Sequence, residues 1–160
     1  MRISSVGKTR GVTLLELLIV VAIAGAMATI ALPAFSNGLD SMRLSQASDS
    51  VAAFLNAAAN RAERRQQVIE ISIAPRDNLI SLRSADSSLA RKLDLPDGIR
   101  VDAVFPRLPG DAGEPRRFLL LPGATAPRIG VQLANRRGAR RIVSLDPITG
   151  VPNIERPENP

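Results

Sequence analysis

The sequence predicts an α+β protein in which a long N-terminal helix packs on a small antiparallel β-sheet domain. A predominantly apolar run extends from Val12 to Leu32, and apolar residues then recur at spacings of three and four from Leu44 to Ala62. From Val68 onward apolar and polar residues alternate. The first two patterns are typical of helices and the third of strands. At 160 residues, the chain has room for one domain and an appendage.

The N-terminal segment, residues 1–11, is short, polar and basic, and Arg2, Lys8 and Arg10 carry half of the net charge of +6. As a helix, the apolar run that follows has a length of roughly 30 Å, the hydrocarbon thickness of a bilayer. We therefore expect residues 12–33 to form a transmembrane or filament-core helix. The basic flank before this run predicts a cytoplasmic N-terminus.

One acidic residue, Glu16, interrupts the apolar run. An unpaired carboxylate at such a position costs about 2.5 to 3.5 kcal/mol or more in a membrane, so a partner is expected. A cut after Gly11 creates a positive α-amine on Val12, one helical turn from Glu16. In a bundle of staggered parallel helices, the amine of one subunit can meet the carboxylate of its neighbour and set the register between them.

These features resemble the class III signal of type IV pilins and type II secretion pseudopilins. The matching residues are Gly11 at the cut, Glu16 as the fifth residue after it, the apolar run, and Pro33 at its end. The resemblance implies cleavage between Gly11 and Val12 by prepilin peptidase, and N-methylation of Val12 by the same enzyme. The first mature residue in this family is usually Phe, whereas here it is Val12.

The resemblance also implies a pilin-like fold and a location. The chain is expected to be a single-pass protein of the bacterial inner membrane, with its C-terminal domain in the periplasm, and then a subunit of a periplasmic pseudopilus. The implied partners are other major and minor pilins or pseudopilins, prepilin peptidase, the inner-membrane assembly platform and the inner-membrane lipid.

Two other interpretations of the N-terminus remain open. A secretory signal peptide also has a basic start, an apolar centre and a small-residue cleavage site, for which Ala26-Met27-Ala28 qualifies. A plain membrane anchor with a stray Glu16 is the other. A mature chain that starts at Val12 supports pilin processing, whereas a start near Thr29 supports the signal peptide.

Beyond the apolar run, Pro33 is expected to kink, loosen or break the helix because it lacks a backbone donor. Residues 34–67 then predict a periplasmic amphipathic helix that ends near residues 65–67. Its apolar stripe consists of positions at helical spacing: Leu44, Ala47, Val51, Phe54, Leu55, Ala58 and Ala62.

Residues 68–156 predict the antiparallel β domain, and residues 157–160 a frayed tail. Residues 85–93 are expected to be a loop with one helical turn, and residues 106–115, with three Pro and two Gly, a surface loop. The expected strands, by alternation and flanking turns, are residues 68–73, 79–83, 99–105, 117–121, 129–133, 140–145 and 151–154.

Within the superfamily, the C-terminal half resembles the H-type minor pseudopilins (general secretion pathway protein H) and the FimT-like minor pilins. The segments that carry this resemblance include Asn60–Arg65, Phe118–Ala124 and Arg141–Leu145. The first implied function is that of a minor pseudopilin, at or near the tip of a type II secretion pseudopilus. The alternative is a FimT-like minor pilin that binds DNA for uptake.

Four arginines at an expected hairpin tip, Arg136, Arg137, Arg140 and Arg141, are the candidate DNA contacts. The competing interpretation is a solvated turn that keeps a sheet edge soluble. The basic Gly-Arg-x-Arg motif of DNA-binding FimT relatives is missing, because Gly150 is followed by Val-Pro-Asn.

The composition argues against an enzyme. The chain has no Cys and no His, which excludes thiolate metal sites, disulfides and most nucleophile–base pairs. No Gly-rich phosphate loop is present. We therefore expect no catalytic residues, no metal and no cofactor, and a structural role.

Overall fold

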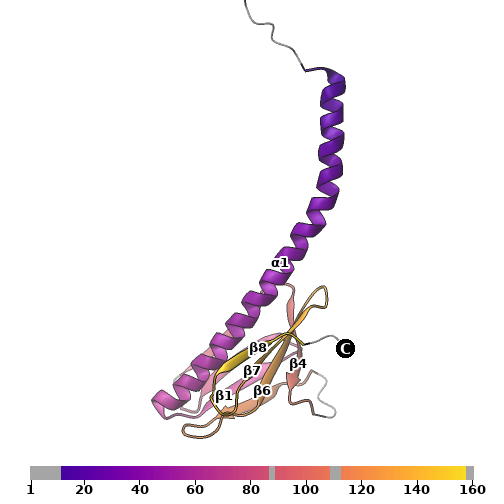
Figure 1. The fold of residues 1–160 in the computed structure, drawn as a ribbon. Helices are drawn as coiled ribbons and strands as arrows, with labels where there is room; N and C mark the ends of the chain where they lie inside the picture. Colours follow the sequence, from indigo (N-terminus) through magenta and orange to yellow (C-terminus); the bar gives the residue numbers. More distant parts are fainter. Residues whose placement is uncertain (1–11, 87–88, 109–112, 158–160) are drawn as a thin grey trace, which may run out of the picture. The chain divides into compact units, whose positions relative to one another are not determined.

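The computed structural model describes residues 12–86, 89–108 and 113–157, and the side chains of residues 30–37 lie outside this description. The chain divides into two compact units, one that ends at Gly38 and one that begins at Leu39. Helix α1 (Leu14–Arg65) contributes to both units, and all the described strands lie in the second (Figure 1). The predicted α+β class, with a helix packed against antiparallel sheets, is confirmed.

Both ends of helix α1 are capped by local chemistry. At the start, the hydroxyl oxygen of Thr13 accepts a hydrogen bond from the backbone N–H of Glu16 at 3.2 Å, as an N-cap residue does. At the end, Gln66 adopts a left-handed conformation with φ of 52°, and the N–H of Gln67 bonds to the carbonyl of Ala62 at 3.2 Å. This six-to-one bond is a Schellman motif, so the predicted helix end near residues 65–67 is confirmed.

The predicted break at Pro33 is not seen, because helix α1 continues through this position. A proline inside a helix removes one backbone hydrogen bond and crowds the preceding turn, but the bonds on either side remain and the helix bends more readily than it ends. Residues 34–67 therefore belong to the same helix as residues 14–33. The side chain of Pro33 itself lies outside the described part.

The strands form two four-stranded sheets, where a single small sheet was expected. Sheet A has the order β3-β2-β1-β5, and sheet B has the order β4-β6-β7-β8, with every neighbouring pair antiparallel. The strands of sheet A are β1 (Ile69–Ala74), β2 (Leu79–Ser84), β3 (Ala90–Asp94) and β5 (Arg116–Leu120). Those of sheet B are β4 (Ile99–Phe105), β6 (Ile129–Asn135), β7 (Arg140–Leu145) and β8 (Pro152–Glu155).

Strand β3 corrects the expectation of a loop with a helical turn at residues 85–93. It pairs with β2 at the edge of sheet A, with Lys92 opposite Ser81. Four of its five residues are exposed, so apolar and polar positions do not alternate as they do in a half-buried strand. The other seven strands lie within two residues of their predicted bounds.

The hydrophobic core lies between helix α1 and the two sheets. The helix contributes the predicted stripe from Leu44 to Ala62, in which Val51, Leu55 and Ala58 are fully buried. Phe54 is the exception, because it is only partly buried and packs against the edge of the core. Strand β6 is the most buried strand, with all seven residues covered, and it forms the centre of sheet B.

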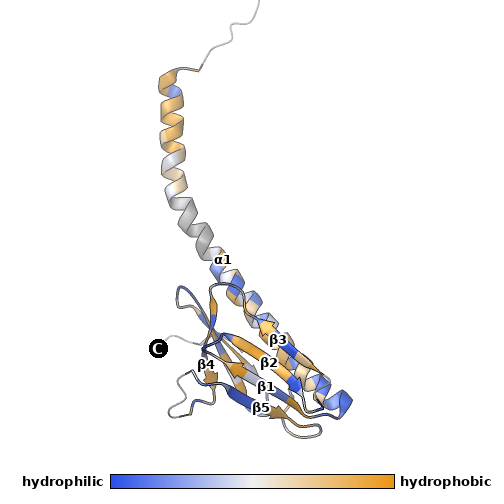
Figure 2. Cartoon of the chain, turned by 180° about the vertical axis from the view of Figure 1, so that it is seen from behind, coloured by the Kyte–Doolittle hydropathy of each residue, from blue (hydrophilic) through white to orange (hydrophobic). Residues whose placement is uncertain are grey.

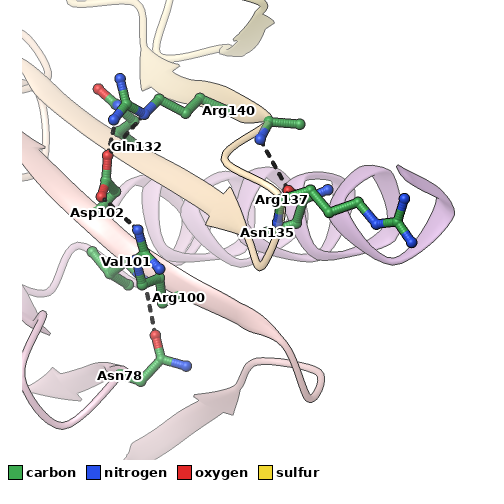
Figure 3. A network of polar contacts seen from close by, with 9 residues as sticks. Asn78, Arg100, Val101, Asp102, Gln132, Asn135, Arg137 and Arg140 are labelled. Atoms are coloured by element: carbon green, nitrogen blue, oxygen red, sulfur yellow. Dashed lines mark hydrogen bonds and ion pairs between the residues drawn. The ribbon is translucent and has the colours of Figure 1, made fainter. Parts of the chain in front are cut away.

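Asn78, in the turn between β1 and β2, ties sheet A to the edge of sheet B. Its side-chain amide donates to the carbonyl of Ile99 at 2.8 Å. It also accepts from the N–H of Val101 at 2.8 Å (Figure 3). Asn78 has a φ of 52°, a left-handed conformation that Asn tolerates better than most residues. Its side-chain amide therefore makes the two hydrogen bonds to β4 that a peptide group of an adjacent strand would otherwise make.

Candidate assembly segment and arginine tip

The first turns of helix α1 expose apolar side chains on every side. From Val12 to Met27 the large apolar residues are between 49 % and 82 % exposed, and Figure 2 shows most of this part of the helix in the hydrophobic colour. A helix that is apolar all round is normally covered by lipid or by other protein. Among the described residues of this unit, no strand covers it. The segment from Val12 to Met27 is called the assembly segment below.

Glu16 lies in the first turn of α1, at the third helical position after the Thr13 cap. An acidic residue here is favoured by the positive end of the helix dipole. Among the described residues Glu16 forms no ion pair, and it is exposed. The carboxylate is therefore available to a positive group from outside the described chain.

The predicted cleavage site is only partly covered by the structure. Gly11 lies outside the described residues, whereas Val12 is 71 % exposed and precedes the helix. Over the described residues, no helical stretch combines the length and the apolar character needed to cross a membrane. The predicted apolar run extends to residue 32, into the positions whose side chains are not described.

The four predicted tip arginines lie at or beside the β6–β7 hairpin, and they point to different places. Arg137 forms an ion pair with Asp40 on helix α1, with 2.9 Å between Nε and Oδ2. Arg141 donates from Nη1 to the hydroxyl of Ser45, also on α1, at 3.0 Å. These two side chains fasten the hairpin to the helix within the second unit.

Arg140 points to the other face of sheet B. Its Nε lies 3.2 Å from Oδ2 of Asp102, which also accepts from the amide of Gln132 at 3.0 Å (Figure 3). Arg100 approaches the second oxygen of Asp102 at 3.5 Å. The β-bulge between Val101 and Ala103 displaces Asp102 from the ladder, which explains why this carboxylate is aimed at the sheet face.

Arg136 lies across the loop before β4, where a Cβ added to Gly98 would come within 3.0 Å of its Nε. The four arginines therefore do not form one cationic patch. Three of them contact Asp40, Ser45 and Asp102, and the fourth packs over a neighbouring loop. Whether these arginines contact DNA, or form a solvated turn that keeps a sheet edge soluble, stays a prediction.

The sequence reasoning missed the residue that shapes this tip. Asn135 is 4 % exposed, and its Oδ1 accepts from the N–H groups of Arg137 at 3.1 Å and Ala139 at 2.9 Å. Gly138, with φ of 83°, completes the turn. An Asn followed three residues later by Gly between two strands is the signal that identifies such a turn.

The described residues contain no group of three or more His, Cys, Asp or Glu side chains able to hold a metal ion. The described residues do offer an apolar helix surface, an exposed carboxylate at Glu16 and a folded domain, which are features suited to association with other helices.

Comparison of the chain with models of known protein families agrees with the N-terminal features described above. Residues 7–32, about a sixth of the chain, match the family model of the prokaryotic N-terminal methylation motif. No curated protein and no solved structure matches the chain. The chain thus carries the N-terminal methylation motif of type IV pilins and type II secretion pseudopilins, together with a pilin-like α+β fold.

Proposed function

We propose that this protein is a minor pseudopilin of a type II secretion system, of the H type. It is a structural subunit at or near the tip of the periplasmic pseudopilus, and it helps to move folded proteins through the outer-membrane channel. The observation that supports the proposal most directly is the position of Glu16, an available acid in the first turn of an apolar helix. The methylation motif over residues 7–32 covers the same segment.

The proposed mechanism is assembly. Prepilin peptidase removes residues 1–11 and methylates the new α-amine of Val12, and the apolar helix holds the subunit in the inner membrane. Glu16 then pairs with the α-amine of an adjacent subunit, which compensates the desolvation of both charges and sets the axial stagger. The assembly segment exchanges lipid for the helices of other pilins or pseudopilins. A separate cytoplasmic ATPase supplies the energy.

Processing is tested first, by intact mass and N-terminal sequencing of the protein from its native membrane. We expect a mature chain that begins with N-methyl-Val12. A chain that retains Met1, or that begins near Thr29, would rule out pilin processing and with it the proposed function.

The role of Glu16 is tested with Glu16→Ala and Glu16→Gln. Both variants should be processed and inserted, because cleavage lies upstream, but both should lose crosslinks to neighbouring subunits since neither carries a charge. Asp49→Ala, an exposed helical acid in the folded domain, is the matched control and should assemble normally. Normal crosslinking of the two Glu16 variants would contradict the pairing.

The alternative, a FimT-like minor pilin of a type IV pilus that binds DNA, makes a different prediction. Binding of duplex DNA by the purified protein, with a steep salt dependence, would favour it. If Arg136, Arg137, Arg140 and Arg141 form the site, changing all four to Ala abolishes that binding. The contacts of three of these arginines with Asp40, Ser45 and Asp102 give this alternative little support.

A further inference from the structure

The first helical residues of the second unit have few apolar contacts with their domain. Helix α1 enters this unit at Leu39, but its first buried apolar residue is Leu44, which is 3 % exposed. Leu39 and Met42 are 42 % and 69 % exposed, and residues 41 and 43 are exposed as well. Since hydrophobic stabilisation scales with the apolar area removed from water, residues 39–43 gain little from the core.

Polar contacts from the β6–β7 hairpin hold this stretch instead. The ion pair of Arg137 with Asp40 lies before Leu44, and the hydrogen bond of Arg141 with Ser45 lies just after it. The two contacts therefore enclose the point at which the helix first joins the core. Gly38, a weak helix former, stands directly before the segment.

The hairpin presents Arg137 from a turn that is already ordered. The buried side chain of Asn135 accepts the backbone N–H of Arg137, and the N–H of Gly138 bonds to the carbonyl of Asn135 at 3.1 Å. Closing the ion pair thus orders little more than the two side chains, which limits its entropic cost.

We propose that Arg137 and Asp40 form an electrostatic latch, which closes the helix segment 39–43 onto the domain and lets that segment open without unfolding the sheets. The two side chains are 44 % and 22 % exposed, so their attraction is modest and is screened by salt. Segments with few buried apolar contacts open at lower cost than the core. This inference holds whether or not the protein is a pseudopilin.

An open latch shortens the helix that the domain holds rigidly. With the latch closed, the rigid helix begins near Leu39, and with the latch open it begins near Leu44, where burial starts. The residues in between are then free to change conformation while the domain persists.

The latch is tested by hydrogen exchange, followed by mass spectrometry, on the full chain in detergent. Asp40→Asn should speed the exchange of amides in residues 40–45 by about two- to fivefold, the effect expected for an exposed ion pair. Strands β1 and β6 should be unaffected. Raising the salt concentration tenfold should speed the same amides in the native protein, but have little effect in Asp40→Asn.

Two variants keep the test specific. Arg136→Gln removes a charge from the same hairpin without removing the ion pair, and it should leave exchange in residues 40–45 unchanged. The charge exchange Asp40→Arg with Arg137→Asp should restore slow exchange. Unchanged exchange in Asp40→Asn, equal acceleration in β1 and β6, or no recovery in the exchanged pair would each overturn the latch.

Discussion

Helix α1 contains two stretches rich in apolar residues, and the exposure of their apolar side chains differs. Between Leu14 and Met27 apolar side chains point in every direction and remain exposed, whereas between Leu44 and Ala62 they form one stripe that the sheets bury. The distribution of apolar residues around a helix therefore indicates what covers it. A stripe is covered by the chain's own domain, and an all-round apolar surface needs lipid or other subunits.

The comparison is tested most strongly by truncating one leucine in each stretch. Leu55→Ala should lower the free energy of unfolding of the domain by about 2 to 5 kcal/mol, because it removes a fully buried side chain and leaves a cavity. Leu18→Ala, at a position 63 % exposed, should leave domain stability unchanged. Urea unfolding followed by circular dichroism measures both, since the chain has no Trp or Tyr for fluorescence.

Equal loss of stability in the two variants would break the comparison, because it would mean that the first stretch is packed within the subunit. A loss of stability in Leu55→Ala alone, together with weaker crosslinking of Leu18→Ala to neighbouring subunits, would support the contrast between the two stretches.

A smaller effect is expected where the two covering sheets are joined. Asn78→Gly keeps the left-handed backbone but removes both hydrogen bonds to β4, and should cost about 1 to 3 kcal/mol because the groups left behind are partly buried. Asn60→Ala is the control, since its amide bonds only along the exposed surface of α1. If both variants lose the same amount, Asn78 contributes nothing specific to the joining of the sheets.

The smallest effect is expected at Asp146, far from the assembly segment in sequence. Hydrogen bonds from the backbone N–H groups of Thr149 and Ile148 lower the pKa of this carboxyl below its ordinary value of 3.8. Its contribution to stability is therefore present above that value and disappears as the pH falls through the lowered pKa. Asp146→Asn keeps an acceptor but does not titrate, so its melting temperature should depend less on pH below about 4.

A melting temperature that falls equally in Asp146→Asn and in the native protein between pH 5 and pH 2 would show that other carboxyls cause the acid sensitivity. A flatter profile in the variant would assign part of it to this turn.

Much of the fold follows from local patterns. The end of α1 and the half-buried strands were predictable because burial on one side imposes a period on the sequence, as in residues 99–105 and 140–145. Strand β3 was not, because a strand with both faces exposed has no such period. The division into two sheets was also hidden, since it depends on pairing between distant segments such as β1 with β5.

The candidate site was predictable only in part. Glu16 is conspicuous because a charge in an apolar run demands an explanation. The tip arginines were conspicuous as a cluster, but their partners were not, because Asp40 and Ser45 lie almost 100 positions away in the sequence. The break expected at Pro33 failed since propensity alone does not outweigh the hydrogen bonds on either side of one proline.

The side-chain amide of Asn78 also affects how prone the unassembled protein is to aggregate. The outer strand β4 would otherwise present the carbonyl of Ile99 and the N–H of Val101 to any passing extended chain. Exposed edge strands of this kind can pair with strands of other molecules, which leads to aggregation. Because the Asn78 amide already bonds to this carbonyl and this N–H, the edge of β4 has fewer free hydrogen-bonding groups. Copies of the protein at high local concentration are therefore less prone to pair through their sheet edges.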